Sequence, residues 1–500
     1  MQKLLIAALI SALFPLAACQ LTGMTLQSAD PLSPVQVPHN LNQLFQEDIE
    51  ELRNEAVYHI EVNIEPSDEE VALTGQEKVR FTNQEMVPLK EIYFRLLPNH
   101  SGNYLSVSNV TVNGESAAIA LAFQDTALRV DLPQPLEIGA SLEIAMDFDA
   151  IVPTSMGGNY GLYIYMQDIM ALDAFFPFIP VYDRDGWQVF DPPMNGDLVF
   201  ADVAFFEVKV NIPQEFIVAS SGTEVHCEVY GERKIITYHG GPQRDFYLAA
   251  SPNFATKTAL TKEGVRVTSY FLEEYREAGE MVLQVGLDAL DVFWNRYGPY
   301  PYTELDLVST PMMAGGMEYS NIVALGLNNY NPLAIAGGVP GSVFLEAAAA
   351  HEVGHQWFYN QIMNDQIHDP WMDEGMVQYA TYLYFVDTYG QDDAQGFYAS
   401  LEERWRLVEN TPIPIGRAAG DYSQIEYSAI IYGRAPLFMD ALRQEMGEQA
   451  FSDFLKSYVE TYRWQEVTPQ DFLLTLEQSC DCDLNAIFAQ WIYEPRTDGE

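Results

Sequence analysis

The chain contains a long region in which apolar and polar residues alternate. In the segment YHIEVNIEP, which begins at Tyr58, the apolar residues Ile60, Val62 and Ile64 fall on every second position. Alternation of this kind is typical of a β-strand with one buried face. Similar segments (VRFTNQ, VTVNG, LEIAMDFDA and FEVKVNIP) follow, separated by proline, glycine and asparagine. The pattern predicts an all-β domain, a sandwich or a saddle-like sheet, over residues 46–255.

The period of the pattern changes at the end of this region. In the segment MVLQVGLDALDVFWNRYG, the residues Val282, Val285 and Ala289 recur at helical spacing, and a Gly-Pro pair ends the segment. Two short apolar runs, LDLVST and NIVALG, come next, and the rest of the sequence has mostly helical periodicity. We therefore predict a multidomain α+β protein in which a mainly helical domain, residues 256–500, follows the β domain.

The N-terminus has the layout of a secretory signal. One lysine precedes an apolar run from Leu4 to Leu16, which is short for a membrane-spanning helix. The run ends in Leu-Ala-Ala-Cys, which resembles the bacterial lipoprotein processing box, in which Cys19 becomes the acylated N-terminus. The alternative is an ordinary signal that is cleaved near Ala18. Acylation would tether the protein to a membrane that it does not span.

This processing divides the N-terminal region into a lipoprotein signal peptide, residues 1–18, and a tether, residues 19–45, that is rich in turn-forming residues. Gln20, after the cysteine, resembles the pattern that sorts lipoproteins to an outer membrane. We expect an exported protein that is lipid-anchored to a bacterial membrane and faces the periplasm or the exterior, with the outer membrane favoured.

The charge of the chain excludes some classes of partner. Its 71 acidic and 25 basic side chains give a net charge of -46 at pH 7. Such a surface repels nucleic acid and anionic membrane surfaces. The acidic residues are scattered and aromatic residues make up 13% of the chain, so the composition indicates a folded protein.

The cysteines do not form a pattern. Besides Cys19, the sequence has Cys227, Cys480 and Cys482, and an odd number in an exported protein gives no disulfide framework. We expect structural thiols or one optional bridge.

The segment GSVFLEAAAAHEVGHQWFYN, residues 341–360, carries the clearest chemistry. It is a strong helix former, with Ser342 as an expected N-cap. His351 and His355 are one helical turn apart and share a face, so their imidazoles could occupy adjacent corners of a zinc tetrahedron. Glu352 could act as a general base on the water at the open position. The alternative is a helix with two hydrogen-bonded histidines and an exposed glutamate.

A second acidic group follows at a fixed spacing. Eighteen residues separate His355 from Glu374, which lies in the segment WMDEG. The combination resembles the zinc aminopeptidases related to aminopeptidase N and leukotriene hydrolase. The resemblance implies a thermolysin-like zinc peptidase domain with one Zn²⁺ per chain, ligated by His351, His355 and Glu374, with Glu352 as the catalytic base.

The family also carries a Gly-x-Met-Glu-Asn loop on an edge strand beside its metal. Here this segment reads Gly315-Gly316-Met317-Glu318-Tyr319. The resemblance implies that these residues bind the substrate and that the Glu318 carboxylate binds its free α-amine. Tyr319 departs from the family, because an asparagine is usual there.

One more part of the chain matches the family. Tyr432 lies in a segment that ends at Gly447, at the spacing of a family tyrosine that donates a hydrogen bond to the developing oxyanion. Tyr427 is a further candidate for substrate binding. Larger relatives continue into a helical superhelix, whereas this sequence ends at TDGE.

These features predict a zinc-dependent aminopeptidase that removes N-terminal residues from peptides outside the cytoplasm. Its expected partners are peptides with a free N-terminus, and nucleic acid is excluded. Three alternatives remain open: an endopeptidase, a non-peptidase hydrolase of the epoxide-opening type, and a non-catalytic surface-binding lipoprotein. No motif specifies an oligomeric state.

Overall fold

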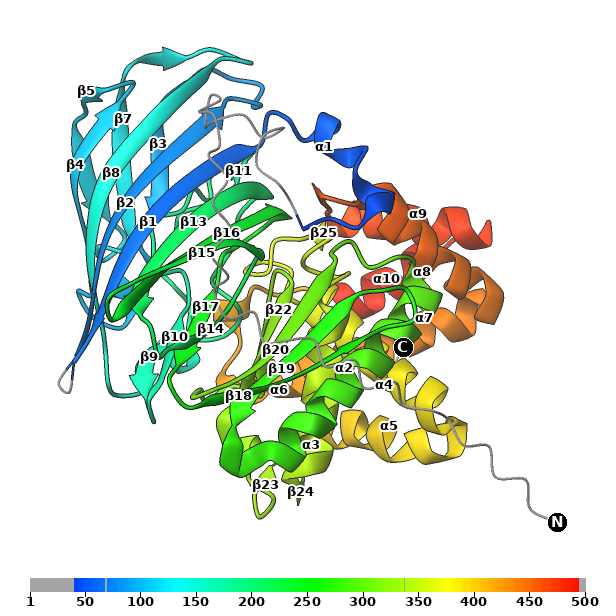
Figure 1. The fold of residues 1–500 in the computed structure, drawn as a ribbon. Coiled ribbons are helices and arrows are strands. Elements are labelled where there is room, and N and C mark those ends of the chain that lie inside the picture. Colours follow the sequence, from blue (N-terminus) through cyan, green and yellow to red (C-terminus); the bar gives the residue numbers. More distant parts are fainter. Residues whose placement is uncertain (1–39, 68–69, 337, 494–500) are drawn as a thin grey trace.

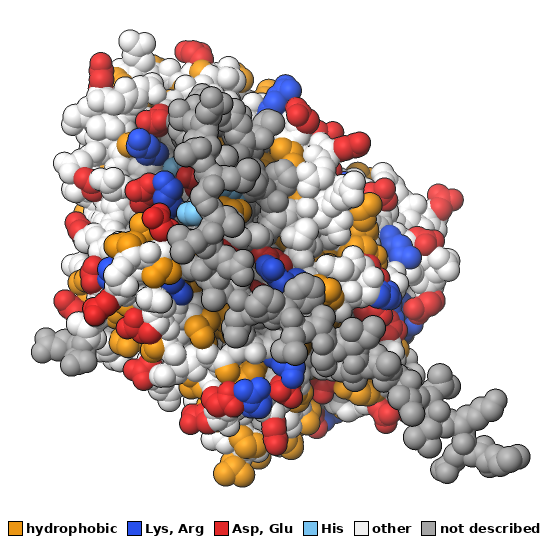
Figure 2. Space-filling view, in the orientation of Figure 1, with side chains coloured by type: hydrophobic (Ala, Val, Ile, Leu, Met, Phe, Trp, Pro, Cys, Tyr) orange, Lys and Arg blue, Asp and Glu red, His pale blue; other side chains and the backbone are white. Residues whose placement is uncertain are grey.

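The structure is a computed structural model, and it describes residues 40–67, 70–336 and 338–493. An all-β half is followed by a mainly helical half, as predicted (Figure 1). No helix among the described residues is long and apolar enough to cross a membrane. Acidic side chains are spread over the visible face of the molecule (Figure 2).

A curved eight-stranded sheet forms the body of the N-terminal half (Figure 1). The strand order is β15-β16-β13-β1-β2-β8-β4-β5. Its strands are β1 (Ala56–Pro66), β2 (Val71–Thr82), β4 (Leu105–Val112), β5 (Glu115–Ser116), β8 (Ser141–Val152), β13 (Ala204–Pro213), β15 (Thr223–Tyr230) and β16 (Arg233–Gln243). The side chains of Ile60, Val62 and Ile64 are buried on the inner face, as their alternation predicts.

Smaller sheets accompany the large one and share its apolar core. One sheet is formed by β3 (Leu89–Arg95), β7 (Ala127–Leu136) and β6 (Ile119–Ala122). Another has the order β14-β17-β10-β9, with β14 (Ile217–Ser220), β17 (Leu248–Ser251), β10 (Ile169–Leu172) and β9 (Tyr163–Met166). The strands β11 (Tyr182–Asp183) and β12 (Gly186–Trp187) pair with each other.

The second half combines a five-stranded sheet with a group of helices (Figure 1). The strand order is β18-β19-β20-β22-β21, with β18 (Phe254–Leu260), β19 (Arg266–Leu272), β20 (Glu304–Thr310), β22 (Ile322–Gly326) and β21 (Gly316–Tyr319). The helices are α2 (Arg276–Tyr297), α3 (Gly341–Gly354), α4 (Met376–Tyr389), α5 (Gln391–Arg406), α6 (Gln424–Ala429), α7 (Ala435–Met446), α8 (Glu448–Tyr462), α9 (Pro469–Cys480) and α10 (Asn485–Ile492). Short strands also pair: β23 (Ile335–Ala336) with β24 (Val339–Pro340), and β25 (Ile362–Met363) with β26 (Gln465–Glu466).

The end of the predicted tether is packed rather than free. Leu41 and Phe45 are buried in the core of the helical half, and the Asn42 amide donates to the Pro301 carbonyl at 2.7 Å. The short helix α1 (Asp48–Glu51) continues this contact, because Asp48 pairs with Arg463. The chain therefore contacts the helical half before it enters the β domain, which the lack of periodicity did not indicate.

The helix that carries the histidines is shorter than predicted. It ends at Gly354, and Pro340 holds the N-cap position with no side-chain cap, so the expectation for Ser342 was wrong. The chain leaves helical geometry just after His355, where the Gln356 side chain donates to the Tyr319 carbonyl and accepts from the Asn321 amide. These tertiary bonds hold the turn against β21, and nothing in the local sequence predicts them.

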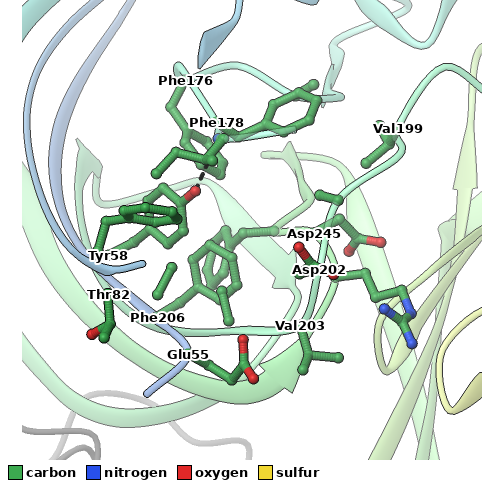
Figure 3. A pocket seen from close by; sticks show the side chains of 18 of the residues that line it. Glu55, Tyr58, Thr82, Phe176, Phe178, Val199, Asp202, Val203, Phe206 and Asp245 are labelled. Atoms are coloured by element: carbon green, nitrogen blue, oxygen red, sulfur yellow. Dashed lines mark hydrogen bonds between the residues drawn. The ribbon is translucent and has the colours of Figure 1, made fainter. Parts of the chain in front are cut away.

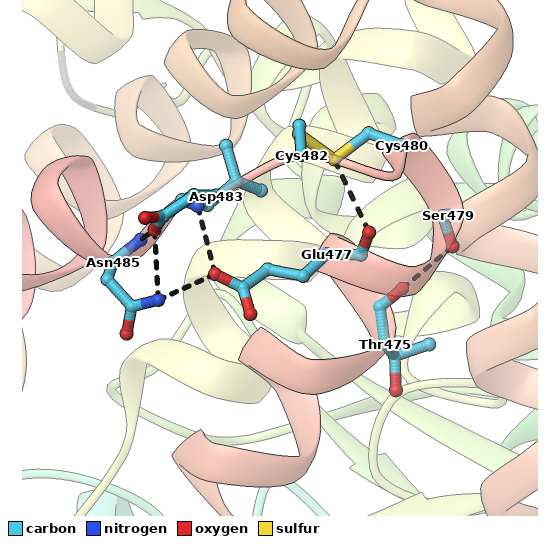
Figure 4. The surroundings of a disulfide bond; sticks show 8 residues. Thr475, Glu477, Ser479, Cys480, Cys482, Asp483 and Asn485 are labelled. Atoms are coloured by element: carbon cyan, nitrogen blue, oxygen red, sulfur yellow. Dashed lines mark hydrogen bonds between the residues drawn. A yellow bond between two sulfur atoms is a disulfide. The ribbon is translucent and has the colours of Figure 1, made fainter.

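One disulfide lies in the turn between α9 and α10, where Cys480 is bonded to Cys482 (Figure 4). The Glu477 carboxylate accepts hydrogen bonds from the Leu484 amide at 3.0 Å and from the Asn485 side chain at 2.7 Å. Together with Glu477, the bridge fixes this turn. Cys227 is disulfide-bonded as well, so the expectation of structural thiols or one optional bridge was wrong.

A buried acid in β2 gives a prediction for stability. Glu77 is 1% exposed, and neither carboxylate oxygen has a hydrogen-bond partner in the part of the chain that the structure describes. Its neighbours across the sheet are Ile60 and Met146, and burial raises its pKa well above the usual 4.5. Because the unfolded chain loses this proton more readily, the stability associated with Glu77 is full below pH 4.5 and is lost as the pH rises.

We expect Glu77→Met to raise the free energy of unfolding relative to the wild type, by an amount that grows with pH at up to about 1.4 kcal/mol per pH unit. Urea unfolding of both proteins between about pH 5 and pH 8 measures this difference. Glu115→Gln, an exposed position on β5, serves as the control and should show no such trend. A Glu77→Met difference that is independent of pH would contradict the prediction.

Candidate metal centre

Two elements place three side chains around one point in the helical half. The last turn of α3 carries His351 and Glu352, and His355 is the C-cap of the helix. Glu374 lies in a π-helical turn, Trp371–Gly375, that leads into α4. A single π turn of this kind is common at functional sites because it redirects a side chain within a helix.

The three ligand atoms fit a metal ion. His351 Nε2 lies 3.1 Å from His355 Nε2 and 3.0 Å from Glu374 Oε2, and His355 Nε2 lies 3.5 Å from the same oxygen. Ligands at 2.0–2.1 Å from a tetrahedral zinc ion are about 3.3 Å apart. The three atoms, His351 Nε2, His355 Nε2 and Glu374 Oε2, thus form a metal-binding triangle of the size that zinc requires. Two imidazoles with one carboxylate are a common ligand set of catalytic zinc.

The tautomers of the two histidines also suit a metal. His355 Nδ1 donates to the Phe358 carbonyl at 2.9 Å. Thr381 Oγ1 donates to the Val377 carbonyl, so it accepts from His351 Nδ1 at 3.4 Å. Both Nε2 atoms then carry lone pairs that face each other, an arrangement that repels unless a cation lies between them.

The Glu374 carboxylate is held on both sides. Oε2 faces the two histidines, while Tyr432 Oη donates to Oε1. The backbone amide of Glu374 donates to Asp373 Oδ1 at 2.7 Å, and this bond stabilises the backbone of the turn that carries Glu374.

Two glutamates lie on the other side of the triangle. Ligand atoms of Glu318, Glu352 and His355 are within 4.8 Å of one another. Glu352 and Glu318 are each 5% exposed, and Glu352 Oε2 has no hydrogen-bond partner in the part of the chain described. Burial raises the pKa of Glu318 to about 7. Glu352 is thus placed between the metal-binding triangle and a second carboxylate.

Strand β21 brings Glu318 to this position. It is the last strand of its sheet and, within the part of the chain that the structure describes, pairs only with β22, so its other edge is unpaired there. The side chains of Met317 and Tyr319 point away from Glu318 into an apolar cluster, where the Tyr319 ring stacks on Tyr247 at 3.9 Å. Met317 can therefore contact a ligand only through its backbone. The Tyr319 side chain points away from the site, so it does not take the place of the family's asparagine.

The glycines before Glu318 make room for the neighbouring side chains. A Cβ on Gly316 would lie 2.5 Å from the Cγ of Glu352, and one on Gly315 would lie 3.1 Å from the Phe344 ring. The backbone of β21 thus approaches α3 closely at the position of the candidate base.

The two candidate tyrosines lie together beside Glu374. Tyr432 belongs to a second π-helical turn, Ile430–Arg434, and its ring centroid is 5.9 Å from that of Tyr427. The hydroxyl of Tyr427 is buried without a hydrogen-bond partner among the described residues. The structure therefore brings every predicted site residue of the helical half into one region, whereas Cys19 lies outside the described residues.

The β domain contributes a segment that the sequence patterns did not indicate. Asn195 donates from its side chain to the Ala419 and Tyr422 carbonyls, which anchors residues 195–197 on the helical half. Asp197 accepts from the Gln366 side chain at 3.1 Å. The pKa of Asp197 is raised to about 8, mainly by burial and to a smaller extent by repulsion from Glu318. An Asn-Gly-Asp sequence predicts a turn, but not the position that the turn reaches.

This geometry predicts that the purified chain binds one zinc ion. We expect His355→Ala to weaken zinc binding by about 100-fold or more, because the buried ring supplies one of three converging ligand atoms. Zinc content after dialysis against a weak chelator, measured by mass spectrometry, tests this expectation. His368→Ala is the control, since that exposed ring bonds to Asp365 and should leave zinc content unchanged. Equal zinc content in the two variants would contradict the assignment.

Comparison with known proteins agrees with this site. Residues 282–491 match the Peptidase family M1 domain. The chain is 26% identical to aminopeptidase M1-C of Oryza sativa subsp. japonica over 77% of its length and 44% of that protein's. It is 23% identical to aminopeptidase N of Lactococcus lactis subsp. lactis, over 78% of this chain and 46% of that protein. The chain thus spans less than half the length of these relatives.

Solved structures show the same fold over nearly the whole chain. A mutant of an M1 zinc metallopeptidase from Deinococcus radiodurans superposes with a TM-score of 0.64 at 19% identity. The match covers 90% of this chain and 96% of that protein, and another structure of the protein holds a Tyr-Ser-Ala substrate. The all-β half and the mainly helical half therefore form the two-part fold of these metallopeptidases. The match of residues 282–491 to the Peptidase family M1 domain agrees with the predicted family.

Proposed function

We propose that this protein is a zinc-dependent aminopeptidase that removes single residues from the free N-terminus of peptides. The observation that carries the proposal is the position of Glu318. Its buried carboxylate lies on an open edge strand, and its ligand atoms are within 4.8 Å of those of Glu352 and His355. A carboxylate fixed so close to the metal-binding triangle would hold the substrate ammonium one residue away from the bond that is cleaved.

The metal would be held by His351, His355 and Glu374. When bound, zinc polarises a carbonyl group and lowers the pKa of water. The remaining steps belong to side chains of this chain. Glu352 would accept the proton of the attacking water and pass it to the leaving amine. Its carboxylate is suited to this role because it is buried and has an oxygen without a protein partner.

The tyrosine pair would act on the other side of the scissile bond. Tyr432 donates to Glu374 Oε1, and a small rotation would direct its hydroxyl toward the developing oxyanion. Tyr427, with a buried hydroxyl that has no partner in the described chain, would contact the same part of the substrate. The open edge of β21 would pair with the peptide backbone as an added strand.

The acidic surroundings of Glu318 support binding of an ammonium group. Asp197 and Asp373 are buried nearby, and their charges and burial raise the pKa of carboxylates in the cluster. A cation relieves this repulsion, whereas a neutral acetylated terminus would leave it in place. The names of the matched relatives, aminopeptidases in several organisms, favour the same reaction.

We also propose that the protein acts outside the cytoplasm, anchored to a bacterial membrane through Cys19. The support is the signal-like sequence before this cysteine. Metabolic labelling with a radioactive fatty acid tests the anchor: Cys19→Ser should lose the label, and a signal that survives this change would contradict it.

The substrate assignment predicts a dependence on the free amine. We expect the wild type to hydrolyse aminoacyl amide fluorophores and to leave their N-acetylated forms intact. Glu352→Gln should lower kcat by about 10²- to 10⁴-fold because proton transfer is lost. Glu318→Ala should mainly raise KM for the free-amine substrate, because its anchor is removed while the metal ligands remain.

The zinc content of each variant provides the control, since neither side chain belongs to the ligand triangle. Equal cleavage of acetylated and free substrates would contradict the role of Glu318 and indicate an endopeptidase. No cleavage by a zinc-loaded wild type would contradict a peptidase and favour a hydrolase of another class.

The packing of Gly316 gives a separate prediction. In Gly316→Ala, the new methyl group would overlap the Glu352 side chain, so the base must move. We expect kcat to fall by about tenfold or more while zinc content stays constant. Gly396→Ala in helix α5, where no atom lies within 4 Å of the added group, is the matched control and should retain full activity. An unchanged kcat for Gly316→Ala would contradict the assignment of Glu352.

A further inference from the structure

A pocket lies between the large sheet and the helical half, behind the strand that carries Glu318 (Figure 3). The space inside it, counted together with the open solvent at its mouth, is about 750 Å³. Tyr319 and Asp245 line its inner end. Asp245 accepts from the Ser320 amide at 3.0 Å, so the pocket contacts the end of β21 on the side away from the metal triangle.

One wall of the pocket is aromatic. The rings of Tyr58, Phe178 and Phe206 face the space from the inner surface of the large sheet and its neighbours (Figure 3). Tyr58 stacks on Phe206 with ring centroids 5.0 Å apart, and the Tyr58 hydroxyl is fixed by the Ile179 amide. A rigid aromatic wall of this kind binds a flat apolar group or a cation near a ring face.

The opposite wall is strongly acidic. Glu55, Glu85 and Asp202 stand near the mouth, where each is at least partly exposed, and Figure 3 shows the Asp202 and Asp245 carboxylates on the same side of the space. Burial, and then repulsion by Asp202, raise the pKa of Glu55 to about 7. The carboxylates at the mouth therefore repel one another, and the positive charge near them is too small for all of them to ionise freely.

One basic side chain, Arg244, is among the described residues that line the pocket, and it is mostly engaged elsewhere. Its Nε donates to the Tyr359 carbonyl at 2.7 Å and its Nη1 lies 3.1 Å from the Met363 sulfur. Arg244 Nη2 is buried without a hydrogen-bond partner among the described residues, whereas the Tyr319 hydroxyl lies close to the carboxylate of Asp173, another lining residue. This buried donor at the inner end thus requires an acceptor atom from a ligand or a water molecule.

We propose that this pocket binds a small primary ammonium ion that carries an aromatic ring and an uncharged oxygen, such as an aromatic amino alcohol. The ring packs against Tyr58 and Phe206, and the ammonium pairs with Glu55 and Asp202 near the mouth. The ligand oxygen accepts from Arg244. This inference does not depend on the proposed peptidase activity.

Other ligand classes fit the pocket less well. An anion would face several carboxylates and one arginine whose charge they already balance. A metal ion is disfavoured because the described side chains that could hold one form two groups, and both belong to the metal centre. A zwitterion would bring its own carboxylate into the acidic wall, so it should bind more weakly than the matching cation.

Isothermal titration calorimetry on the zinc-loaded full chain tests this proposal with three probes that share one ring. The probes are phenylalaninol as the cation, phenylalanine as the zwitterion and 3-phenylpropanol as the neutral analogue. The titrations are made in Glu318→Ala, so that the amine anchor of the metal centre does not contribute. We expect saturable one-to-one binding of phenylalaninol, with at least about tenfold weaker binding of the other two probes.

Two variants in the Glu318→Ala background locate the site. Asp202→Asn with Glu55→Gln should weaken phenylalaninol binding by about tenfold or more, and Ala201→Leu, which fills the space, should weaken all three probes. Glu115→Gln, an exposed acid outside the pocket, should change nothing. Thermal unfolding confirms that each variant is folded.

Phenylalaninol binding that appears in the wild type but disappears in Glu318→Ala would overturn the proposal, because the amine would then bind at the metal centre. Equal affinity for the cation and the neutral alcohol, or affinity that the pocket variants do not change, would also overturn it.

Discussion

The site depends on holding two imidazole nitrogens and one carboxylate oxygen within 3.0–3.5 Å of one another. Without a cation this arrangement is unfavourable, because the hydrogen bonds at both Nδ1 atoms leave lone pairs facing a charged oxygen. The surrounding packing keeps it in place. Gly354 approaches Val377 and Gly375 approaches Ala435 so closely that a Cβ on either glycine would lie within 3 Å of a neighbouring side chain. Small residues therefore let α3, α4 and α7 come together at the ligands.

The parts of the site that follow from local geometry could be predicted from the sequence. A spacing of four residues on a helix fixes the relation of His351 to His355, and alternation on a strand fixes which face Ile60 and Ile64 bury. Glu374 and Tyr432 were found by resemblance, since no local rule links residues 18 or more positions apart. The structure brings both to the histidines through π-helical turns.

The features that sequence reasoning missed all depend on tertiary contacts. The end of α3 is set by bonds from Gln356 to β21, and residues 40–45 are held by the core of the helical half. Asp197 reaches the site because Asn195 binds carbonyls more than 200 positions away. Such contacts leave no periodic signal in the chain, so composition and spacing could not reveal them.

The large negative charge of the chain has local consequences at two places. Around Glu318 and in the pocket behind β21, carboxylates lie close enough to raise one another's pKa. A cation would stabilise each of these two groups of acids. The metal-binding triangle lies beside the group around Glu318. The metal is thus assigned to the two histidines and Glu374, and the substrate ammonium to the neighbouring carboxylates, although His355 contributes to both possible ligand groups.

The most direct test of this assignment is anomalous diffraction at the zinc absorption edge from crystals of the zinc-loaded protein. We expect one peak within bonding distance of His351 Nε2, His355 Nε2 and Glu374. A peak between Glu318, Glu352 and His355 instead, or no peak at this site, would contradict it.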